Sequence, residues 1–157
     1  MDARQNLQYI ARLNRIPDEV SAKRIETLLK DVGLYGEAEK KVGTYSKGMR
    51  QRLGIAEVLI KEPRLLFLDE PTIGLDPDGT NWMLDLIRSL SRENNITIFL
   101  SSHLLDQVQR ICDRVGIMIK GHLVAMGPID ELAKKKLGVD KEHYTLEEIY
   151  MKYFKEA

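Results

Sequence analysis

The chain has 157 residues, enough for one domain with a buried core, and the composition of an ordinary globular protein. Its 24 Lys and Arg residues balance its 24 Asp and Glu residues, which argues against a large nucleic-acid-binding surface. The single cysteine, Cys112, excludes an intrachain disulfide and a cysteine-based metal cluster. No stretch approaches the ~20 apolar residues of a membrane-spanning helix, so any membrane role is expected to work through a partner chain.

The first third of the sequence is predicted to be helical. Apolar residues around Leu7 recur at helical spacing, and a second helix is expected from Asp18 to a glycine cap at Gly33. A third helix is expected to follow Ser46. We therefore predict that residues 1–62 form a helical subdomain that ends in this third helix.

Strands and helices alternate in the middle of the sequence, residues 63–127. The apolar run at residues 65–68 predicts a parallel strand that is buried on both faces. Further strands are expected at residues 96–100 and 115–119, with helices between them. This alternation predicts an α/β fold with a parallel sheet. Residues 128–157 are expected to add carboxy-terminal helices.

Two adjacent carboxylates, Asp69 and Glu70, directly follow the apolar run at residues 65–68. In α/β proteins, ligands bind at the carboxyl ends of the parallel strands, which is where this pair is expected. Asp69 could hold Mg²⁺, and Glu70 could polarise a water molecule for attack on a γ-phosphate. A turn with two solvated carboxylates explains the pair equally well when it is considered alone.

A second candidate site is the start of the third predicted helix, where Ser46, Lys47 and Gly48 lie in sequence. Ser46 can cap the helix, and Gly48 lets the backbone approach a ligand closely. The exposed backbone N–H groups and the charge of Lys47 would then favour an anion. Taken alone, these residues are better explained as an ordinary capped helix start.

Two further features have plain explanations of their own. His103 follows the predicted strand at residues 96–100 and could donate a hydrogen bond to a phosphate oxygen, although a solvated loop histidine is the simpler interpretation. Residues 74–77, which include Asp76, could be only a turn and a helix start.

In order and spacing, these four features together resemble the latter half of the ATPase subunits of ATP-binding-cassette (ABC) transporters. Residues 45–49 are similar to the family signature, residues 65–70 to the Walker B strand, residues 74–77 to the D-loop and His103 to the switch histidine. The resemblance covers essentially the whole chain. Residues 145–150 resemble the end of subunits that are paired with ABC-2-type export permeases. The fold implied is the later part of a P-loop NTPase core, preceded by a helical signature subdomain.

The resemblance implies roles for the candidate residues. Asp69 would serve Mg²⁺, Glu70 would be the general base and His103 would contact the γ-phosphate of ATP. The residues expected to contact nucleotide are Ser46, Lys47, Gly48 and Asp76. In the intact family, two ATP-binding subunits sandwich two ATP molecules, and their closure drives a membrane permease. The expected partners are therefore a permease and a second ATP-binding subunit, identical or different, with no nucleic acid. The expected location is the cytoplasmic side of the cell membrane.

The sequence also departs from the family. The usual signature reads Leu-Ser-Gly-Gly-Gln, whereas Tyr45, Lys47 and Met49 replace its Leu, first Gly and Gln. No glycine is followed directly by lysine, so the P-loop pattern Gly-x-x-x-x-Gly-Lys-Ser/Thr is missing. The chain resembles a family member begun at an internal Met, by truncation, gene fragmentation or a misassigned start. We therefore expect that it neither binds nor hydrolyses ATP alone.

Two alternatives belong to other functional classes. A non-catalytic interaction module would dock on a permease or on an intact ABC ATPase, and the missing P-loop favours it. A soluble ABC ATPase of DNA repair or translation is disfavoured by the balanced charge and by the lack of a long coiled-coil insertion. The transported substrate is not readable from these residues, because ABC ATPases do not contact it.

Overall fold

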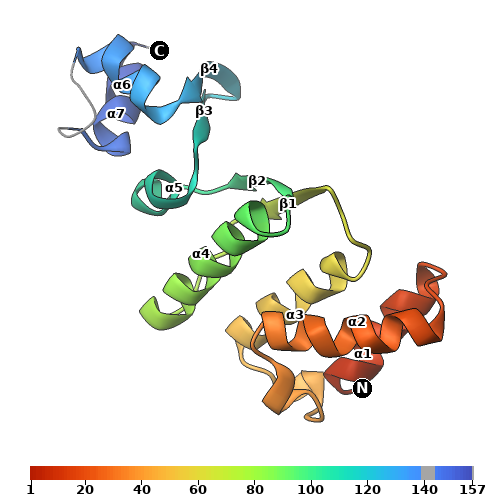
Figure 1. The fold of residues 1–157 in the computed structure, drawn as a ribbon. Coiled ribbons are helices and arrows are strands. Elements are labelled where there is room, and N and C mark those ends of the chain that lie inside the picture. Colours follow the sequence, from red (N-terminus) through yellow and green to blue (C-terminus); the bar gives the residue numbers. More distant parts are fainter. Residues whose placement is uncertain (139–143, 157) are drawn as a thin grey trace. The chain divides into compact units, whose positions relative to one another are not determined.

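The computed structural model describes residues 1–138 and 144–156, and the chain divides into two compact units (Figure 1). The first unit is Met1–Ser101 and the second is Ser102–Ala157. The three-part division predicted from the sequence, with boundaries after residues 62 and 127, stays a prediction. Within the described residues, no helix has both the length and the apolar character needed to cross a membrane.

Three helices open the first unit: α1 (Ala3–Leu13), α2 (Asp18–Asp31) and α3 (Lys47–Leu59). Single 3-10 turns lie between α2 and α3, at Tyr35–Glu37 and Val42–Thr44. The three helices confirm the predicted helical first third. Their shared core consists of side chains that are almost fully buried, and its largest members are Leu7, Leu29, Leu34, Leu53 and Ile60.

The end of α2 shows why the sequence stops the helix there. Gly33 adopts a left-handed conformation with φ of 63°, which a residue without a Cβ adopts at little cost. Its N–H donates to the Lys30 carbonyl at 2.9 Å, and the Leu34 N–H donates to the Leu29 carbonyl at 2.8 Å. These two bonds form a Schellman motif. The predicted glycine cap at Gly33 is therefore confirmed.

A strand–helix–strand unit completes the first unit. Strands β1 (Leu65–Asp69) and β2 (Thr97–Ser101) pair in parallel, and helix α4 (Pro77–Arg92) connects them. The register pairs Leu65 with Thr97 at one end and Asp69 with Ser101 at the other. The predicted α/β fold with a parallel sheet is confirmed.

One face of this two-stranded sheet is open. Leu66 is only 3% exposed, but its neighbours Leu65 and Phe67 are 49% and 68% exposed, and Phe99 on β2 is 64% exposed. The predicted burial of β1 on both faces is therefore wrong for the described residues. The reason is what packs against the sheet. Helix α4 contacts β2, but no described element of the first unit covers the face that bears Phe67 and Phe99.

The described residues of the second unit form an antiparallel hairpin and three helices. Helix α5 (Leu105–Ile111) precedes strands β3 (Arg114–Ile119) and β4 (His122–Pro128), and α6 (Ile129–Leu137) and α7 (Leu146–Glu156) follow them. The strand predicted at residues 115–119 is confirmed as β3, and it pairs antiparallel with β4. The reason is local, because Lys120 and Gly121 both have positive φ and form a two-residue hairpin turn.

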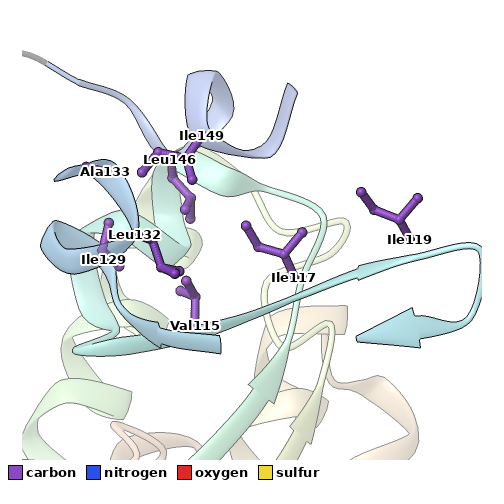
Figure 2. Close-up of a cluster of buried hydrophobic side chains, with 8 residues drawn as sticks. All are labelled: Val115, Ile117, Ile119, Ile129, Leu132, Ala133, Leu146 and Ile149. Carbon is purple, nitrogen blue, oxygen red and sulfur yellow. The ribbon is translucent and has the colours of Figure 1, made fainter. Parts of the chain in front are cut away.

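The core of the second unit lies between the hairpin and the last two helices. Figure 2 shows the alternate β3 residues Val115, Ile117 and Ile119 with the side chains of α6 and α7 that belong to the same buried cluster. Helix α7 begins with a capping box, in which Thr145 and Glu148 each accept the other's backbone N–H at 3.2 and 2.8 Å. The buried cluster consists of Val115, Ile117, Ile119, Ile129, Leu132, Ala133, Leu146 and Ile149.

The open sheet face leads to a prediction about association. Apolar strands with uncovered faces and edges tend to pair with further chains, so we expect the 157-residue chain to self-associate as its concentration rises. Analytical ultracentrifugation at low and high concentration measures this directly. Phe67→Gln should reduce self-association, whereas Phe154→Gln, which removes a 49% exposed phenylalanine from α7, should not. A monomer that melts sharply at both concentrations would contradict the expectation.

Candidate functional site

The parallel register brings Asp69 and Ser101 together at the carboxyl end of the sheet. The Ser101 hydroxyl donates a hydrogen bond to the Asp69 carboxylate, although 32 positions separate the two residues. Both side chains are exposed and lie on the same sheet face as Phe67, because side chains alternate between the faces of a strand. Asp69 therefore presents its carboxylate at the open face, with its orientation restrained by Ser101.

Glu70 lies in the turn that ends β1. Its N–H still donates to the Ser101 carbonyl at 3.1 Å, and its own carbonyl accepts from the Ile73 N–H at 3.2 Å. Its φ is 46°, in the left-handed region, which costs a non-glycine residue about 1–2 kcal/mol. The surrounding hydrogen bonds hold this conformation, so the chain turns away from the strand directly after Asp69. The Glu70 side chain is half-buried.

The start of α3, residues 46–48, is called the signature turn. The Ser46 side chain accepts a hydrogen bond from the Met49 N–H at 3.2 Å, so it caps the helix as the sequence predicts. Ser46 and Lys47 are exposed, and Gly48 is half-buried. The predicted nucleotide-contacting residues of the signature turn therefore lie at the surface of the first unit.

Tyr45, which replaces the leucine of the usual signature, anchors this turn. Its side chain is only 3% exposed, and its hydroxyl donates to the Glu37 carbonyl at 2.8 Å. Burial is the main cause that raises the pKa of the phenol, so Tyr45 stays a neutral hydrogen-bond donor at ordinary pH. Arg50 in turn donates to the Tyr45 carbonyl. Tyrosine at this position therefore keeps a buried side chain and adds a hydrogen bond to the backbone.

Residues 74–77 form a second turn, called here the D-loop turn, which leads into α4. Asp76 caps the helix, because its carboxylate accepts from the Gly79 N–H at 2.8 Å. Pro77 occupies the first helical position, where its missing N–H costs nothing. Asp76 thus has a structural task in addition to the nucleotide contact that the sequence predicts.

The signature turn and the D-loop turn touch each other. Gly74 has φ of 71°, and the Lys47 ammonium occupies the space that a Cβ at this position would take. A Cβ on Gly48 would lie 3.3 Å from Leu75 Cδ2. The structure therefore brings two of the four predicted nucleotide-contacting residues, Lys47 and Gly48, against the turn that contains another, Asp76.

His103 belongs to the second unit, and its predicted contact with the γ-phosphate stays a prediction. Its imidazole is exposed, and the following Leu104 N–H donates to the Ser102 side chain at 3.1 Å. Cys112, in the same unit, is not a candidate nucleophile. Burial, followed by the charge of Asp113, raises the pKa of its thiol to about 11, so the thiol stays protonated at neutral pH.

The donor chemistry at Asp69 fits a magnesium ion. Nowhere in the described part of the chain do three or more His, Cys, Asp or Glu side chains gather around a common point. Mg²⁺ in ATPase sites, however, needs only one or two protein carboxylates, because phosphate and water oxygens complete its shell. One exposed carboxylate that is oriented by a neighbouring hydroxyl meets that requirement.

Sequence reasoning missed Ser101 and the contact of Lys47 with Gly74. Ser101 could have been found, because Asp69 and Ser101 each directly follow a predicted strand, and parallel strands carry their carboxyl ends at the same edge of a sheet. No sequence signal links Lys47 to Gly74, because that contact depends on how two turns meet in space.

A helical subdomain followed by a parallel strand–helix–strand unit with carboxylates at the strand end defines the later part of a P-loop NTPase core. A sequence model of the family "ABC transporter" matches residues 1–73. The bacitracin transport ATP-binding protein BcrA of Bacillus licheniformis is 47% identical over 135 residues, which cover 86% of this chain and 43% of BcrA. The chain therefore belongs to the family of ABC transporter ATP-binding subunits.

Two solved structures support the same assignment. The ATP-binding subunit of an ABC transporter superposes with a TM-score of 0.79 at 26% identity, covering 98% of this chain and 62% of that one. CbiO1 from Clostridium perfringens, described as part of the ABC transporter complex cbiONQ, gives a TM-score of 0.77 at 34% identity, covering 87% and 55%. The chain thus spans less than two thirds of each of these relatives.

The contact between the two turns leads to a prediction about Gly74. Gly74→Ala should destabilise the chain by about 1–2 kcal/mol, because alanine is strained at positive φ and its Cβ would displace Lys47. Urea unfolding measures the change. Gly54→Ala is the matched control, since a Cβ there meets open space within α3 and should stabilise by up to about 1 kcal/mol. A Gly74→Ala chain as stable as the parent would contradict this account of the contact.

Proposed function

We propose that the chain is part of an ABC transporter ATP-binding subunit that couples ATP binding and hydrolysis to export through a membrane permease. The observation that carries the proposal is the placement of Asp69 and Glu70 at the carboxyl end of the parallel pair β1 and β2. The 47% sequence identity with BcrA, which is named for bacitracin transport, supports a transport role.

The chemistry proposed for this site is phosphoryl transfer to water. ATP with bound Mg²⁺ supplies the phosphoryl group and neutralises part of its charge. Asp69 would hold the metal ion, and the Ser101 hydroxyl would keep the Asp69 carboxylate in place. Glu70 would accept a proton from the attacking water at its carboxylate, and His103 would donate a hydrogen bond to the γ-phosphate. These roles follow from the resemblance to the family, position by position.

The proposed partner of the signature turn is a nucleotide held by a second ATP-binding subunit. Ser46, Lys47 and Gly48 would contact that nucleotide together with Asp76. The exposure of Ser46 and Lys47 supports this arrangement, because a surface turn can meet another chain. CbiO1 is described as part of a transporter complex, which supports an assembly of this kind for the present chain. The proposed location is peripheral, on the cytoplasmic face of the cell membrane, through the permease.

A second candidate function is a non-catalytic interaction module that docks on a permease or on an intact ABC ATPase. The observation that favours it is the missing P-loop pattern in the 157 residues. In this family, P-loop amides and a lysine provide triphosphate affinity and stabilise charge in the transition state. A general base is ineffective when no phosphate is held within its reach. We therefore propose that these 157 residues alone do not hydrolyse ATP.

The general-base role of Glu70 is testable in a longer version of the protein that includes a P-loop. Glu70→Gln should retain ATP binding and lower the turnover rate by about 10²–10⁴-fold, because the attacking water loses its proton acceptor. Steady-state ATPase assays together with equilibrium ATP binding measure the two effects. Glu93→Gln makes the same change at an exposed residue that follows α4 and should leave turnover unchanged. Near-normal turnover of Glu70→Gln would exclude the role.

The contribution of the 157 residues alone is testable by calorimetry. We expect no MgATP binding and no ATP hydrolysis by this chain, but ATP-dependent association with an intact ATP-binding subunit that supplies a P-loop. Lys47→Glu should weaken that association, because it reverses the charge that faces the partner's nucleotide. Hydrolysis that copurifies with the chain and disappears in Glu70→Gln would overturn the expectation that the missing P-loop is disabling.

A further inference from the structure

Three elements of the first unit meet at Trp82 on α4, the only tryptophan of the chain. The guanidinium carbon of Arg52, on α3, lies 4.8 Å from the centre of the Trp82 ring. Arg52 Nη1 also donates to the carbonyl of Gly33, the residue that caps α2, over a long 3.4 Å. The cation over the aromatic face is an attractive interaction that strengthens when water is partly excluded, and both side chains are half-buried.

Gly33 makes room for this cluster of Gly33, Arg52 and Trp82, called here the Trp82 cluster. A Cβ on Gly33 would lie 3.3 Å from Trp82 Cζ2 and 3.3 Å from Arg52 Nη1, tighter than ordinary packing. The same glycine that ends α2 in a Schellman motif therefore also lets the indole ring and the guanidinium approach the helix end. The cluster joins α2, α3 and α4 at one point.

The position of the cluster along the helices is informative. Arg52 lies six residues after Ser46, the residue that caps α3, and Trp82 lies six residues after Asp76, the residue that caps α4. At 1.5 Å per residue, each side chain is about 9 Å along its helix from the capping residue. The same two helices already touch at their starts, where Lys47 meets Gly74 and Gly48 meets Leu75. Helices α3 and α4 are thus joined at two separate levels.

Contacts at two levels restrict the relative direction of α3 and α4 more than a contact at one level does. A single contact between the turns would act as a pivot about which the two helices could change their relative direction. The second contact, at Trp82, removes that freedom. We propose that Trp82, acting through Arg52, is a positioning residue that fixes the orientation of the signature turn, residues 46–48, relative to the D-loop turn, residues 74–77. The inference rests on the proposed function in one respect, which is that both turns contact nucleotide.

The alternative is that the Trp82 cluster merely stabilises the fold. Helix α3 also packs on α1 and α2, through buried residues such as Leu53 and Ala56. Loss of the cluster should therefore leave α3 folded within the three-helix core and release only its alignment with α4. A general loss of stability would instead act on the whole first unit. The two interpretations thus predict different locations for the effect.

Hydrogen exchange of individual amides in the 157-residue chain separates the two interpretations. Arg52→Gln should accelerate exchange several-fold at the Met49 and Gly79 amides, which donate to the two capping side chains. Amides in the interior of α1 and α2 should not change. Arg52→Lys keeps a cation and should restore slow exchange at both amides, whereas Arg92→Gln, at the exposed end of α4, should have no effect. Unchanged exchange at the turns, or equal acceleration throughout the first unit, would overturn the proposal.

Fluorescence adds a second measurement, because all tryptophan emission comes from Trp82. Arg52→Gln should make the emission more accessible to a neutral quencher such as acrylamide, and Arg52→Lys should reverse that change. Equal quenching in all three chains would contradict the cation–ring contact on which the proposal depends.

Association with an intact ATP-binding subunit links the cluster to function. Trp82→Leu should weaken ATP-dependent association several-fold, and Trp82→Phe, which keeps an aromatic ring, should restore most of it. If both variants lose association in proportion to their loss of folded protein, the role of Trp82 is merely structural and the proposal is overturned. If the unmodified chain shows no ATP-dependent association, the proposed function fails, while the exchange measurements still decide the positioning role of Trp82.

Discussion

The parallel pairing of β1 with β2 is the constraint on which the candidate site depends. In a parallel pair both strands run in the same direction, so the residues that end them become neighbours. This places Ser101 beside Asp69 and lets the Ser101 carbonyl receive the Glu70 N–H. The left-handed turn at Glu70 is then held by hydrogen bonds on both sides. Without the pairing, the two carboxylates would be an ordinary solvated turn.

The open face of this sheet combines apolar and polar chemistry. Phe67 and Phe99 lie in contact, with ring centres 5.6 Å apart, and Asp69 and Ser101 follow them on the same face at the carboxyl end. Any element that covered the two phenylalanines would therefore also come close to the carboxylate. Exclusion of water from the apolar part would strengthen the electrostatic interactions of Asp69, because charges interact more strongly where the local dielectric constant is lower.

The signature turn and the D-loop turn share one construction. Each is the start of a helix, and in each a short polar side chain, Ser46 or Asp76, accepts a backbone N–H in the first turn. Close approach of the two turns is possible because Gly74 and Gly48 have no side chains at the points of contact. The capping bonds and the interhelical contacts thus hold the turns from within the chain, and their outer surfaces remain available to a ligand.

The sequence by itself determined the local features of this protein. Gly33 ends α2, Ser46 and Asp76 start α3 and α4, and apolar runs mark the strands, because caps, turns and periodicity act between residues a few positions apart. The pattern of residues at 45–49, 65–70 and 74–77 also indicated the family. All of these signals are short-range, so they can be read without knowing which elements meet.

Only the tertiary structure decided the pairing and exposure of these elements. The apolar run of β1 could not reveal that Phe67 lies on an uncovered face, since burial depends on what packs against a strand and not on the strand itself. The contact of Lys47 with Gly74 and the stacking of Arg52 on Trp82 likewise join residues through space. Such contacts depend on how helices and turns are oriented toward one another, which packing between distant parts of the chain sets.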